Sequence, residues 1–253
     1  MKIDQTGRRN FITKMALGTL GAMSIPNLAD AAVSDSKAKK ITLKNNDVIL
    51  FQGDSITDAN RSKTDFQANS SKTLGQGYVF HTAAELLRSH PTKNLQIHNR
   101  GVSGHKVPQL AERWEKDTID LKPTVLSILI GVNDYWHKKL SNYTGTAASY
   151  KSGYRELLQK TKEKLPDVKL IILEPFAIEG SAVGKEWFGP FQEYQNASKE
   201  IADEFDAPFV PYQKIFNKAL EIAPGSQWAP DGVHPSLAGA RLMADAWLET
   251  IRG

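Results

Sequence analysis

The chain has 253 residues, of which 40% are hydrophobic, a formal net charge of +4 and no cysteine. This length suits one well-buried domain and is short for two, and the lack of cysteine excludes disulfides and cysteine-bound metals. Lysine and arginine residues are dispersed among acidic residues instead of forming a basic patch, which argues against a nucleic-acid partner.

The first 31 residues have the pattern of an export signal. Arg8 and Arg9 precede an apolar, glycine-containing run over residues 15–25, and the tripeptide Ala-Asp-Ala at 29–31 then offers the small residues that a signal peptidase cuts. Paired arginines of this kind resemble a twin-arginine signal, so we expect a bacterial protein that is exported to the periplasm or secreted. The run is too short for a stable membrane anchor, which needs about 20 residues. An amphipathic first helix of a cytosolic protein is the alternative.

Two segments follow the predicted signal peptide 1–31. Residues 32–40 are small, polar and lysine-rich, and because they have nothing to bury they are predicted to form a flexible tether. Residues 41–253 show no repeat and no low-complexity tract, so we predict one domain over this range.

Five apolar runs of strand length alternate with helical patterns in this predicted domain. They cover residues 48–51, 95–98, 125–130, 170–173 and 208–210. Continuous apolar runs such as 125–130 are typical of parallel strands that are covered on both faces. The alternation predicts an α/β fold with a doubly wound, five-stranded parallel sheet, whose functional sites lie at the carboxyl ends of the strands.

The helical segments have apolar residues at helical spacing. One stripe contains Val107, Leu110, Trp114 and Leu121, and a second contains Tyr150, Tyr154, Leu157, Leu158 and Leu165. The last helix is predicted to start at Ser236 and to turn these side chains inward: Leu237, Ala240, Met243, Ala244 and Trp247. Trp114 and Trp247 are therefore predicted to be core residues.

A serine, a histidine and an aspartate follow predicted strands at one edge of this sheet. Ser55 comes directly after the first strand, and His234 lies between the last strand and the final helix. A serine hydroxyl needs a base to become nucleophilic, so His234 is predicted to accept its proton. Asp231 precedes His234 by three residues, and this span lets its carboxylate hold one ring nitrogen while the other faces Ser55. The pattern predicts a Ser-His-Asp catalytic triad.

Two further strand ends supply donors for an oxyanion, each of which is typically worth about 3–4 kcal/mol. Residues 99–104 (Asn-Arg-Gly-Val-Ser-Gly) follow the second strand, where Gly101 lets a backbone N–H approach a reacting carbonyl closely. Asn133 follows the third strand, and its side-chain amide can donate. Four strand ends therefore each contribute one part of the predicted site.

Together these blocks resemble the SGNH/GDSL hydrolase family, in which a serine, a glycine, an asparagine and a histidine stand in separate blocks. The matching residues are Ser55, Gly101, Asn133 and His234, with Ile56 where the family label has leucine. The resemblance implies a flavodoxin-like three-layer fold, esterase chemistry, and an oxyanion hole formed by the N–H groups of Ser55 and Gly101 and the amide of Asn133. The α/β-hydrolase fold is disfavoured, because Ser55 lies near the start of the domain and lacks the second glycine of G-x-S-x-G.

Three longer stretches, residues 51–58, 131–136 and 174–176, resemble the acetylxylan esterase branch of this family. This resemblance implies a serine esterase that removes O-acetyl groups from a carbohydrate such as xylan or xylo-oligosaccharides, and a homo-oligomer. One alternative is a lipolytic esterase, lysophospholipase or thioesterase with an apolar acyl tunnel. A non-catalytic carbohydrate-binding protein is another, which the intact triad disfavours.

Candidate substrate contacts lie near the predicted triad in sequence. Aromatic faces stack on sugar rings, and the candidates for such a platform are Tyr135, Trp136, Trp187, Phe188 and Trp228. Trp136 and Trp228 are favoured because they adjoin predicted site residues. Asp54 and Arg61 lie close to Ser55 and are candidates for polar contacts, although Arg61 suits an exposed salt bridge equally well.

No ligand spacing such as H-E-x-x-H, no P-loop and no strand-linked G-x-G-x-x-G occurs in the chain, so the sequence predicts neither a metal nor a cofactor. Each block alone also fits a structural explanation. Residues 53–55 suit a helix-capping turn, 231–232 a reverse turn, Asn133 a helix N-cap and Gly101 a close-packed strand end. Their coincidence at one edge of one sheet favours catalysis.

Overall fold

The computed structural model describes residues 39–252, so the predicted signal peptide and most of the predicted tether lie outside the described residues. The two ends of the described chain lie side by side, because Ile41 and Ile251 form a parallel bridge and the N–H of Ile41 donates to the carbonyl of Thr250 at 2.7 Å. No helix within residues 39–252 is long and apolar enough to cross a membrane.

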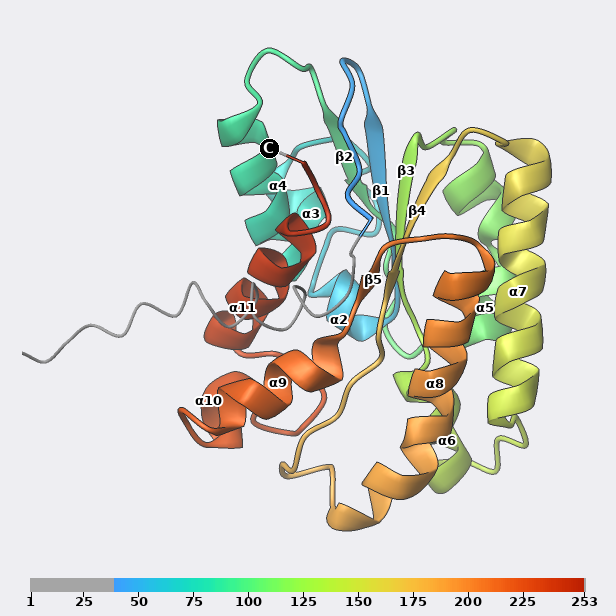
Figure 1. The fold of residues 1–253 in the computed structure, drawn as a ribbon, viewed down its shortest axis with the longest axis vertical. Coiled ribbons are helices and arrows are strands. Elements are labelled where there is room, and N and C mark those ends of the chain that lie inside the picture. Colours follow the sequence, from blue (N-terminus) through green and yellow to red (C-terminus); the bar gives the residue numbers. More distant parts are fainter. Residues whose placement is uncertain (1–38, 253) are drawn as a thin grey trace, which may run out of the picture.

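A five-stranded parallel sheet with the order β2-β1-β3-β4-β5 forms the centre of the molecule (Figure 1). The strands are β1 (Val48–Gly53), β2 (Gln96–Asn99), β3 (Val125–Leu129), β4 (Lys169–Leu173) and β5 (Phe209–Val210). Every residue of β3 is buried, as its continuous apolar run predicts. The predicted α/β fold with a five-stranded parallel sheet is confirmed, and each strand ends within two residues of its predicted bounds.

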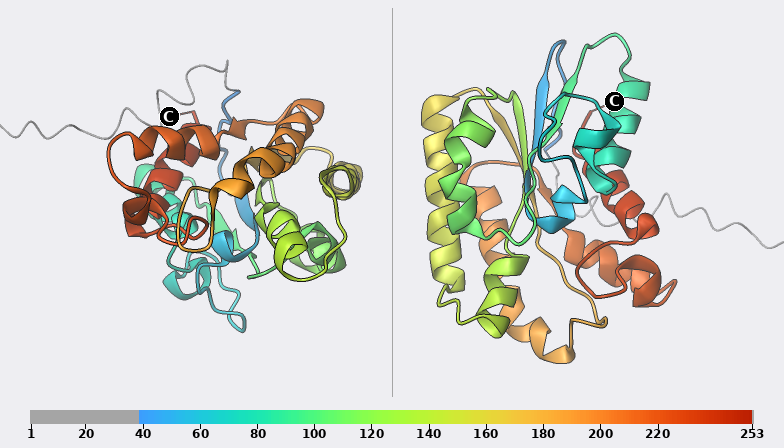
Figure 2. Two further views of the ribbon diagram at one scale, coloured as in Figure 1. Left: turned by 90° about the horizontal axis from the view of Figure 1, so that it is seen from below. Right: turned by 180° about the vertical axis from the view of Figure 1, so that it is seen from behind.

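Helices cover both faces of the sheet, which gives the predicted three layers (Figure 2). On one side α4 (Tyr78–Ser89) packs against α11 (Leu237–Leu248), and on the other α7 (Ala147–Lys164) packs against α5 (Val107–Glu112) and α8 (Phe188–Glu204). The shorter helices are α2 (Ser55–Asp58), α3 (Ser71–Leu74), η1 (Glu115–Ile119), α6 (Val132–Leu140), η2 (Lys185–Trp187), α9 (Tyr212–Leu220) and α10 (Gly225–Trp228).

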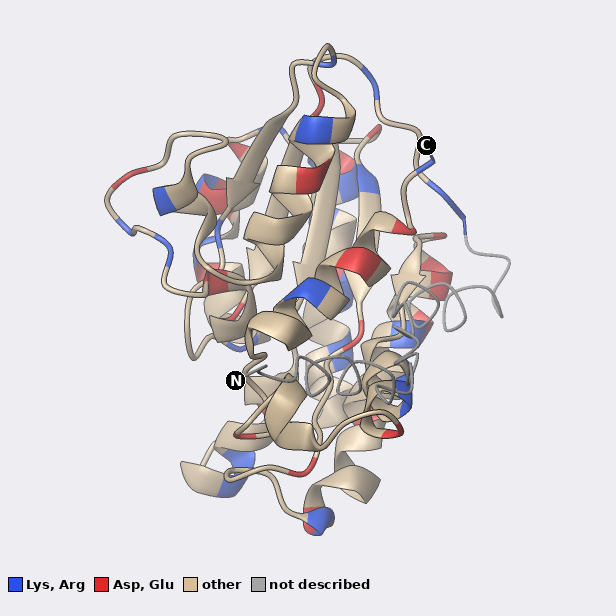
Figure 3. Cartoon of the chain, turned by 90° about the vertical axis from the view of Figure 1, so that its left-hand side faces the viewer, with Lys and Arg blue, Asp and Glu red and all other residues tan. Residues whose placement is uncertain are grey.

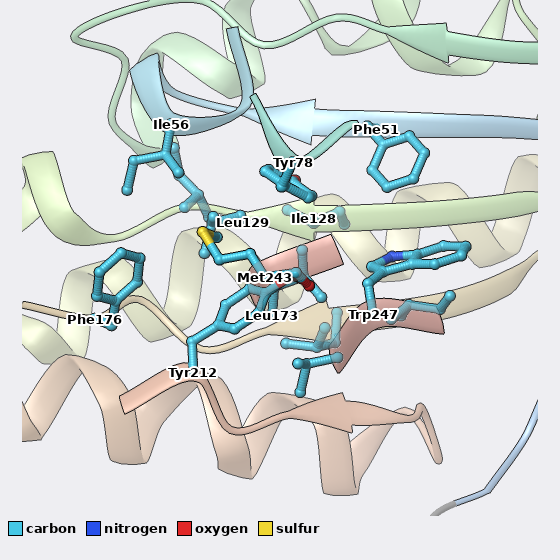
Figure 4. Close-up of a cluster of buried hydrophobic side chains, with 14 of the residues drawn as sticks. Phe51, Ile56, Tyr78, Ile128, Leu129, Leu173, Phe176, Tyr212, Met243 and Trp247 are labelled. Carbon is cyan, nitrogen blue, oxygen red and sulfur yellow. Dashed lines mark hydrogen bonds between the residues drawn. The ribbon is translucent and has the colours of Figure 1, made fainter. Parts of the chain in front are cut away.

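Large aromatic side chains fill the space between the sheet and α4 and α11 (Figure 4). The ring of Phe51 on β1 lies 5.1 Å from that of Trp247 and 5.8 Å from that of Tyr78. The indole N–H of Trp247 donates to Ser127 Oγ at 2.9 Å, and on the other face the indole of Trp114 is equally buried. Both tryptophans are core residues, as predicted. Burying an apolar side chain such as Phe51 stabilises the fold by about 1.5–3 kcal/mol.

Two helix predictions are wrong. The stripe over residues 107–121 does not form one helix, because α5 ends at Glu112 and η1, a π-helix, begins at Glu115. Leu237 was expected to face inward but is 75% exposed. It is the first residue of α11, directly after the Ser236 cap, so its side chain lies beyond the layer that the following turns bury.

Lysine and arginine residues are interspersed with aspartate and glutamate on the face shown in Figure 3. Arg241 and Asp245, one turn apart on α11, pair at 2.6 Å, and on the other side of the sheet Arg155 of α7 pairs with Glu204 of α8 at 2.7 Å. Exposed pairs of this kind contribute only about 0–1 kcal/mol each. The helices are therefore held on the sheet mainly by their buried faces.

Candidate active site

Ser55, His234 and Asp231 form a continuous hydrogen-bonded chain at the carboxyl edge of the sheet. Ser55 Oγ lies 2.8 Å from His234 Nε2, and His234 Nδ1 lies 2.6 Å from Asp231 Oδ2. The side chains of His234 and Asp231 are 44% and 31% exposed, so solvent reaches them. The fold thus brings together the three residues of the predicted triad, although 179 positions separate Ser55 from His234.

The second carboxyl oxygen of Asp231 is also occupied. Oδ1 accepts the backbone N–H groups of Val233 at 2.9 Å and His234 at 2.7 Å. Burial raises the pKa of Asp231, but the hydrogen bonds from the His234 side chain and from these N–H groups outweigh it, and the pKa lies below its usual value. Asp231 therefore stays ionised at neutral pH and fixes Nδ1 of the ring as the protonated nitrogen when the histidine is neutral.

The segment after β4 supports the loop that carries Asp231 and His234. The N–H of Ile178 donates to the carbonyl of Gly232 at 2.9 Å, and the N–H of Ala182 donates to that of Asp231 at 3.0 Å. The backbone of this loop is thus fixed, while the ring of His234 stays open to solvent.

Ser55 is the first residue of α2, immediately after β1. A Cβ on Gly53 would lie 2.3 Å from the carbonyl oxygen of Leu129, so only glycine fits the turn. Asp54 caps α2 by accepting the N–H of Ile56 at 3.0 Å. The N–H of Ser55 itself has no hydrogen-bond partner among the described residues.

Asn99 at the end of β2 ties three segments together. Its Nδ2 donates to the carbonyls of Thr57 at 2.6 Å and Leu74 at 2.9 Å, and its Oδ1 accepts the N–H of Gly101 at 2.9 Å. The N–H of Gly101 is therefore already used, and the prediction that it lines an oxyanion hole is wrong. Gly101 is required for packing instead, because a Cβ there would lie 2.4 Å from the backbone N of Asp58.

The free N–H of this loop belongs to Gly104. Its φ is +80°, a conformation that favours glycine, and within residues 39–252 its N–H has no partner. The preceding residue, Ser103, lines a cavity of about 400 Å³ together with Ser55 and His234. Asn133 Nδ2 donates one hydrogen to the carbonyl of His105 at 3.2 Å and keeps a second for a ligand.

Asp54 and Arg61, the predicted polar contacts to substrate, are structural residues. Asp54 is fully buried, and Arg61 is only 6% exposed. The Nε of Arg61 donates to the carbonyl of Gly101 at 2.7 Å, and its Nη1 donates to that of Ser62 at 2.9 Å. Arg61 thus holds the turn after β2, and it is not the exposed salt-bridge residue that the sequence also suggested.

Most of the predicted aromatic platform is also core. Tyr135 and Trp187 are 5% and 2% exposed, with ring centres 5.0 Å apart, and Phe188 packs against the same core. Trp228 is 4% exposed, and its indole N–H donates to the carbonyl of Ala219 at 3.0 Å. Trp136 is different, because it is partly buried and its ring centre lies 6.1 Å from that of His234.

Two buried carboxyl groups belong to residues next to the site in the sequence, since Asp54 precedes Ser55 and Asp134 follows Asn133. Burial raises the pKa of each to about 7, and for Asp54 the nearby Asp134 adds to the effect. Oδ1 of Asp134 accepts the N–H of Val107 at 3.2 Å. Oδ2 of both groups is buried without a partner in the described part of the chain. Burial therefore favours the protonated form of both carboxyl groups below neutral pH.

Sequence reasoning did not identify Arg113 and Asp58, whose side chains hold the loops around the site. Arg113 reaches from the end of α5 to the end of β1, where its guanidinium donates to the carbonyls of Arg100 at 2.7 Å and Gly53 at 3.1 Å. Asp58 accepts the N–H of Ser103 at 2.9 Å and its hydroxyl at 2.8 Å. The acid at position 58 lies in the same block as Ser55, which was a usable signal, whereas no local pattern marks Arg113.

In residues 39–252 no group of three or more histidines and acidic residues could hold a metal ion.

Comparison with known proteins agrees with this geometry. A model of the GDSL-like lipase/acylhydrolase family matches residues 51–242. An acetylxylan esterase of Geobacillus stearothermophilus is 36% identical over 205 residues, which are 80% of this chain and 93% of the relative.

Solved structures show the same likeness. A GDSL-like lipase candidate from Parabacteroides merdae superposes with a TM-score of 0.82 at 46% identity, over 83% of this chain and 98% of the other. The acetylxylan esterase Axe2 of G. stearothermophilus superposes with a TM-score of 0.75 at 32% identity, over 84% and 100%. The Axe2 variants described as catalytic mutants change a serine, an aspartate and a histidine, the last two three positions apart, as Asp231 and His234 are here.

Proposed function

Because this chain belongs to the GDSL-like lipase/acylhydrolase family and is a carboxylic ester hydrolase, we propose that it removes O-acetyl groups from an acetylated carbohydrate such as xylan or xylo-oligosaccharides. One observation carries the proposal: the hydrogen-bonded chain of Ser55, His234 and Asp231 occurs in a protein that is 36% identical to an acetylxylan esterase. A serine hydroxyl held 2.8 Å from a histidine nitrogen is arranged for nucleophilic attack.

In the first half of the reaction, Ser55 Oγ attacks the acetyl carbonyl carbon while His234 Nε2 takes its proton. The carbonyl oxygen becomes an oxyanion. The donors that suit it are the N–H of Ser55, the N–H of Gly104 and the free hydrogen of Asn133 Nδ2, since the N–H of Gly101 is used by Asn99. The C–O bond to the sugar then breaks, and the sugar oxygen takes the proton from His234.

The second half releases acetate. Water attacks the acetyl group on Ser55, its proton passes to His234 Nε2, and the serine leaves with that proton. Throughout both halves Asp231 holds Nδ1 at 2.6 Å, which keeps Nε2 directed at the serine and stabilises the positive ring.

The test is acetate release from acetylated xylan by the purified protein and by Ser55→Ala, with an aryl acetate as a second substrate. We expect release by the wild type and a loss of about 10⁴-fold or more on both substrates in the variant. Hydrolysis of the aryl acetate without release of acetate from xylan would reject the proposed substrate, while the esterase activity would stand. Preference for an octanoyl ester over an acetyl ester would favour the lipolytic alternative.

We also propose that the protein is exported, on the basis of the paired Arg8 and Arg9 and the apolar run that follows them. A fusion of residues 1–31 to a reporter protein tests this directly. The reporter is expected in the periplasm or medium of a bacterial host, and replacement of both arginines by lysine is expected to keep it in the cytoplasm. Unchanged export of that variant would contradict the twin-arginine assignment.

A further inference from the structure

A second, larger cavity opens beside the one that contains Ser55 and His234. Its volume is about 670 Å³, which lies within the range of about 300–1,000 Å³ usual for small-molecule sites. Asn60 and Gln76 line both cavities, so the two adjoin each other. Pro235 lines the first cavity, and Leu237, two residues later, lines the second. We call this second cavity, lined by Asn60, Lys72, Gln76, Phe80 and Leu237, the side groove.

The side groove offers apolar surface to a ligand. Phe80 on α4 is 36% exposed and Leu237 at the start of α11 is 75% exposed. Phe80 meets His81 edge to face, at 5.9 Å and 82°, which does not cover the ring by stacking. An exposed aromatic ring of this kind suits the apolar face of a sugar ring.

Polar groups without partners line the same groove. The side chains of Asn60, Lys72 and Gln76 are exposed and line the groove, and the described part of the chain provides no hydrogen-bond or ion-pair partner for any of these side chains. A saccharide has an apolar ring face and a rim of hydroxyl groups, so it matches both halves of this lining. An alkyl chain would use the phenyl ring and leave the three polar side chains without a function.

We propose that the side groove is a subsite for the saccharide unit that neighbours the acetylated sugar, with Phe80 under its ring and Asn60 and Gln76 at its hydroxyl groups. This inference rests on the proposed function, because it takes the acetylated unit to lie at Ser55. Its consequence is a preference for acetylated oligosaccharides over an acetylated single sugar.

The experiment compares kcat/KM on acetylated xylotriose, on an acetylated methyl xyloside and on an aryl acetate. The wild type is expected to prefer the oligosaccharide over the single sugar. Phe80→Ala is expected to lower the ratio of the xylotriose value to the aryl acetate value about tenfold, which corresponds to about 1.4 kcal/mol. Ile222→Ala is the matched control, because Ile222 is 59% exposed and lies outside both cavities. It should leave the ratio unchanged.

Gln76→Ala is a second variant, and because Gln76 lies outside α4 it leaves the packing of that helix unchanged. It is expected to lower the same ratio about threefold, whereas Gln67→Ala, an exposed amide outside the groove, is expected to leave it unchanged. Thermal melting of all four variants shows whether each is folded under the assay conditions.

The failure of this inference and the failure of the proposed function look different. If the wild type hydrolyses the aryl acetate but releases acetate from neither saccharide, the proposed function fails. If acetate is released but chain length has no effect, or both groove variants keep the wild-type ratio, the subsite is rejected while the function stands. If Phe80→Ala changes the molecular mass of the protein in solution but leaves the ratio of the two kcat/KM values unchanged, a second copy of the chain covers Phe80. A selective loss on an octanoyl ester would mean that the groove holds the acyl chain, and either result overturns the proposal.

Discussion

The two halves of the candidate active site are built differently. The serine half, residues 53–61 and 99–104, is mostly buried and is tied together by side chains that bond to backbone groups, among them Asn99 and Arg61. The histidine half, residues 228–235, holds its ring in the open, with 44% of the His234 side chain exposed against none of Asp54. Apart from Ser55, the polar side chains of the serine half therefore act mainly on the fold, whereas the exposed side chain of His234 acts mainly on the reaction.

Burial explains the difference. A buried polar group that loses its partner costs about 1–3 kcal/mol, so replacing a buried polar residue of the serine half, such as Asn99, leaves unpaired groups behind. An exposed group that loses its partner bonds to water instead. We therefore expect substitutions of buried residues in the serine half to lower stability, and substitution of His234 to lower turnover.

The largest effect is expected for His234→Ala. Without the base, kcat on an aryl acetate should fall by about 10⁴-fold or more, because the Ser55 proton has no acceptor. Since the ring is open to solvent, the melting temperature should move by no more than about 2 °C. His90→Ala, at the end of α4, is the control and should change neither value. A melting temperature lowered by many degrees in His234→Ala would show that His234 also stabilises the fold, which would contradict the contrast between the two halves.

Asn99→Ala is the corresponding test of the serine half. It removes three buried hydrogen bonds, to Thr57, Leu74 and Gly101, and should lower the free energy of unfolding by about 2–4 kcal/mol in urea titrations. Asn217→Ala is the matched control, because Asn217 is exposed and its side chain accepts a hydrogen bond from Gln213 on its own helix. If both variants were equally stable, the hydrogen bonds of Asn99 would not hold the serine half together.

Asp54→Asn should change how stability depends on pH. Burial raises the pKa of Asp54 to about 7, whereas the unfolded chain releases this proton near pH 4. The folded protein thus keeps a proton that the unfolded chain has lost, so its stability falls as pH rises from about 4 to about 7. Asparagine keeps the acceptor for the N–H of Ile56 and carries no charge.

Relative to the wild type, Asp54→Asn should therefore gain on the order of 3 kcal/mol between pH 4.5 and pH 8.5, as measured by urea unfolding at both values. The exposed carboxylate of Asp203 supplies the control, Asp203→Asn. A difference between wild type and Asp54→Asn that stays constant with pH would show that this buried acid does not titrate as described.

The sequence predicted what depends on local pattern and on topology. Apolar runs gave the strands, and the rule that parallel strands end at one edge brought Ser55 and His234 together before any contact was known. The Ser236 start signal was also right, since its side chain caps α11 by accepting the N–H of Gly239.

What the sequence could not give depends on how side chains compete for partners. Gly101 and Gly104 lie in one block, and only the structure shows that Asn99 takes the N–H of the first. Trp228 stands close to Asp231 in sequence, but its indole N–H finds a carbonyl on the preceding helix and the ring is buried. Arg113 reaches β1 through tertiary packing alone.

The smallest effect, and the finest test of the contrast, concerns Trp136. Its ring lies 6.1 Å from His234 on the open side and 5.6 Å from the buried Trp187 on the other, so it stands between the two environments. If it belongs to the histidine half, Trp136→Ala should raise KM for an acetylated saccharide about fivefold, or about 1 kcal/mol, with little loss of kcat on an aryl acetate. Trp136→Phe keeps a ring and should restore most of that affinity. A melting temperature lowered by several degrees with KM unchanged would instead place Trp136 with the core, because the packing on Trp187 would then be its main contribution.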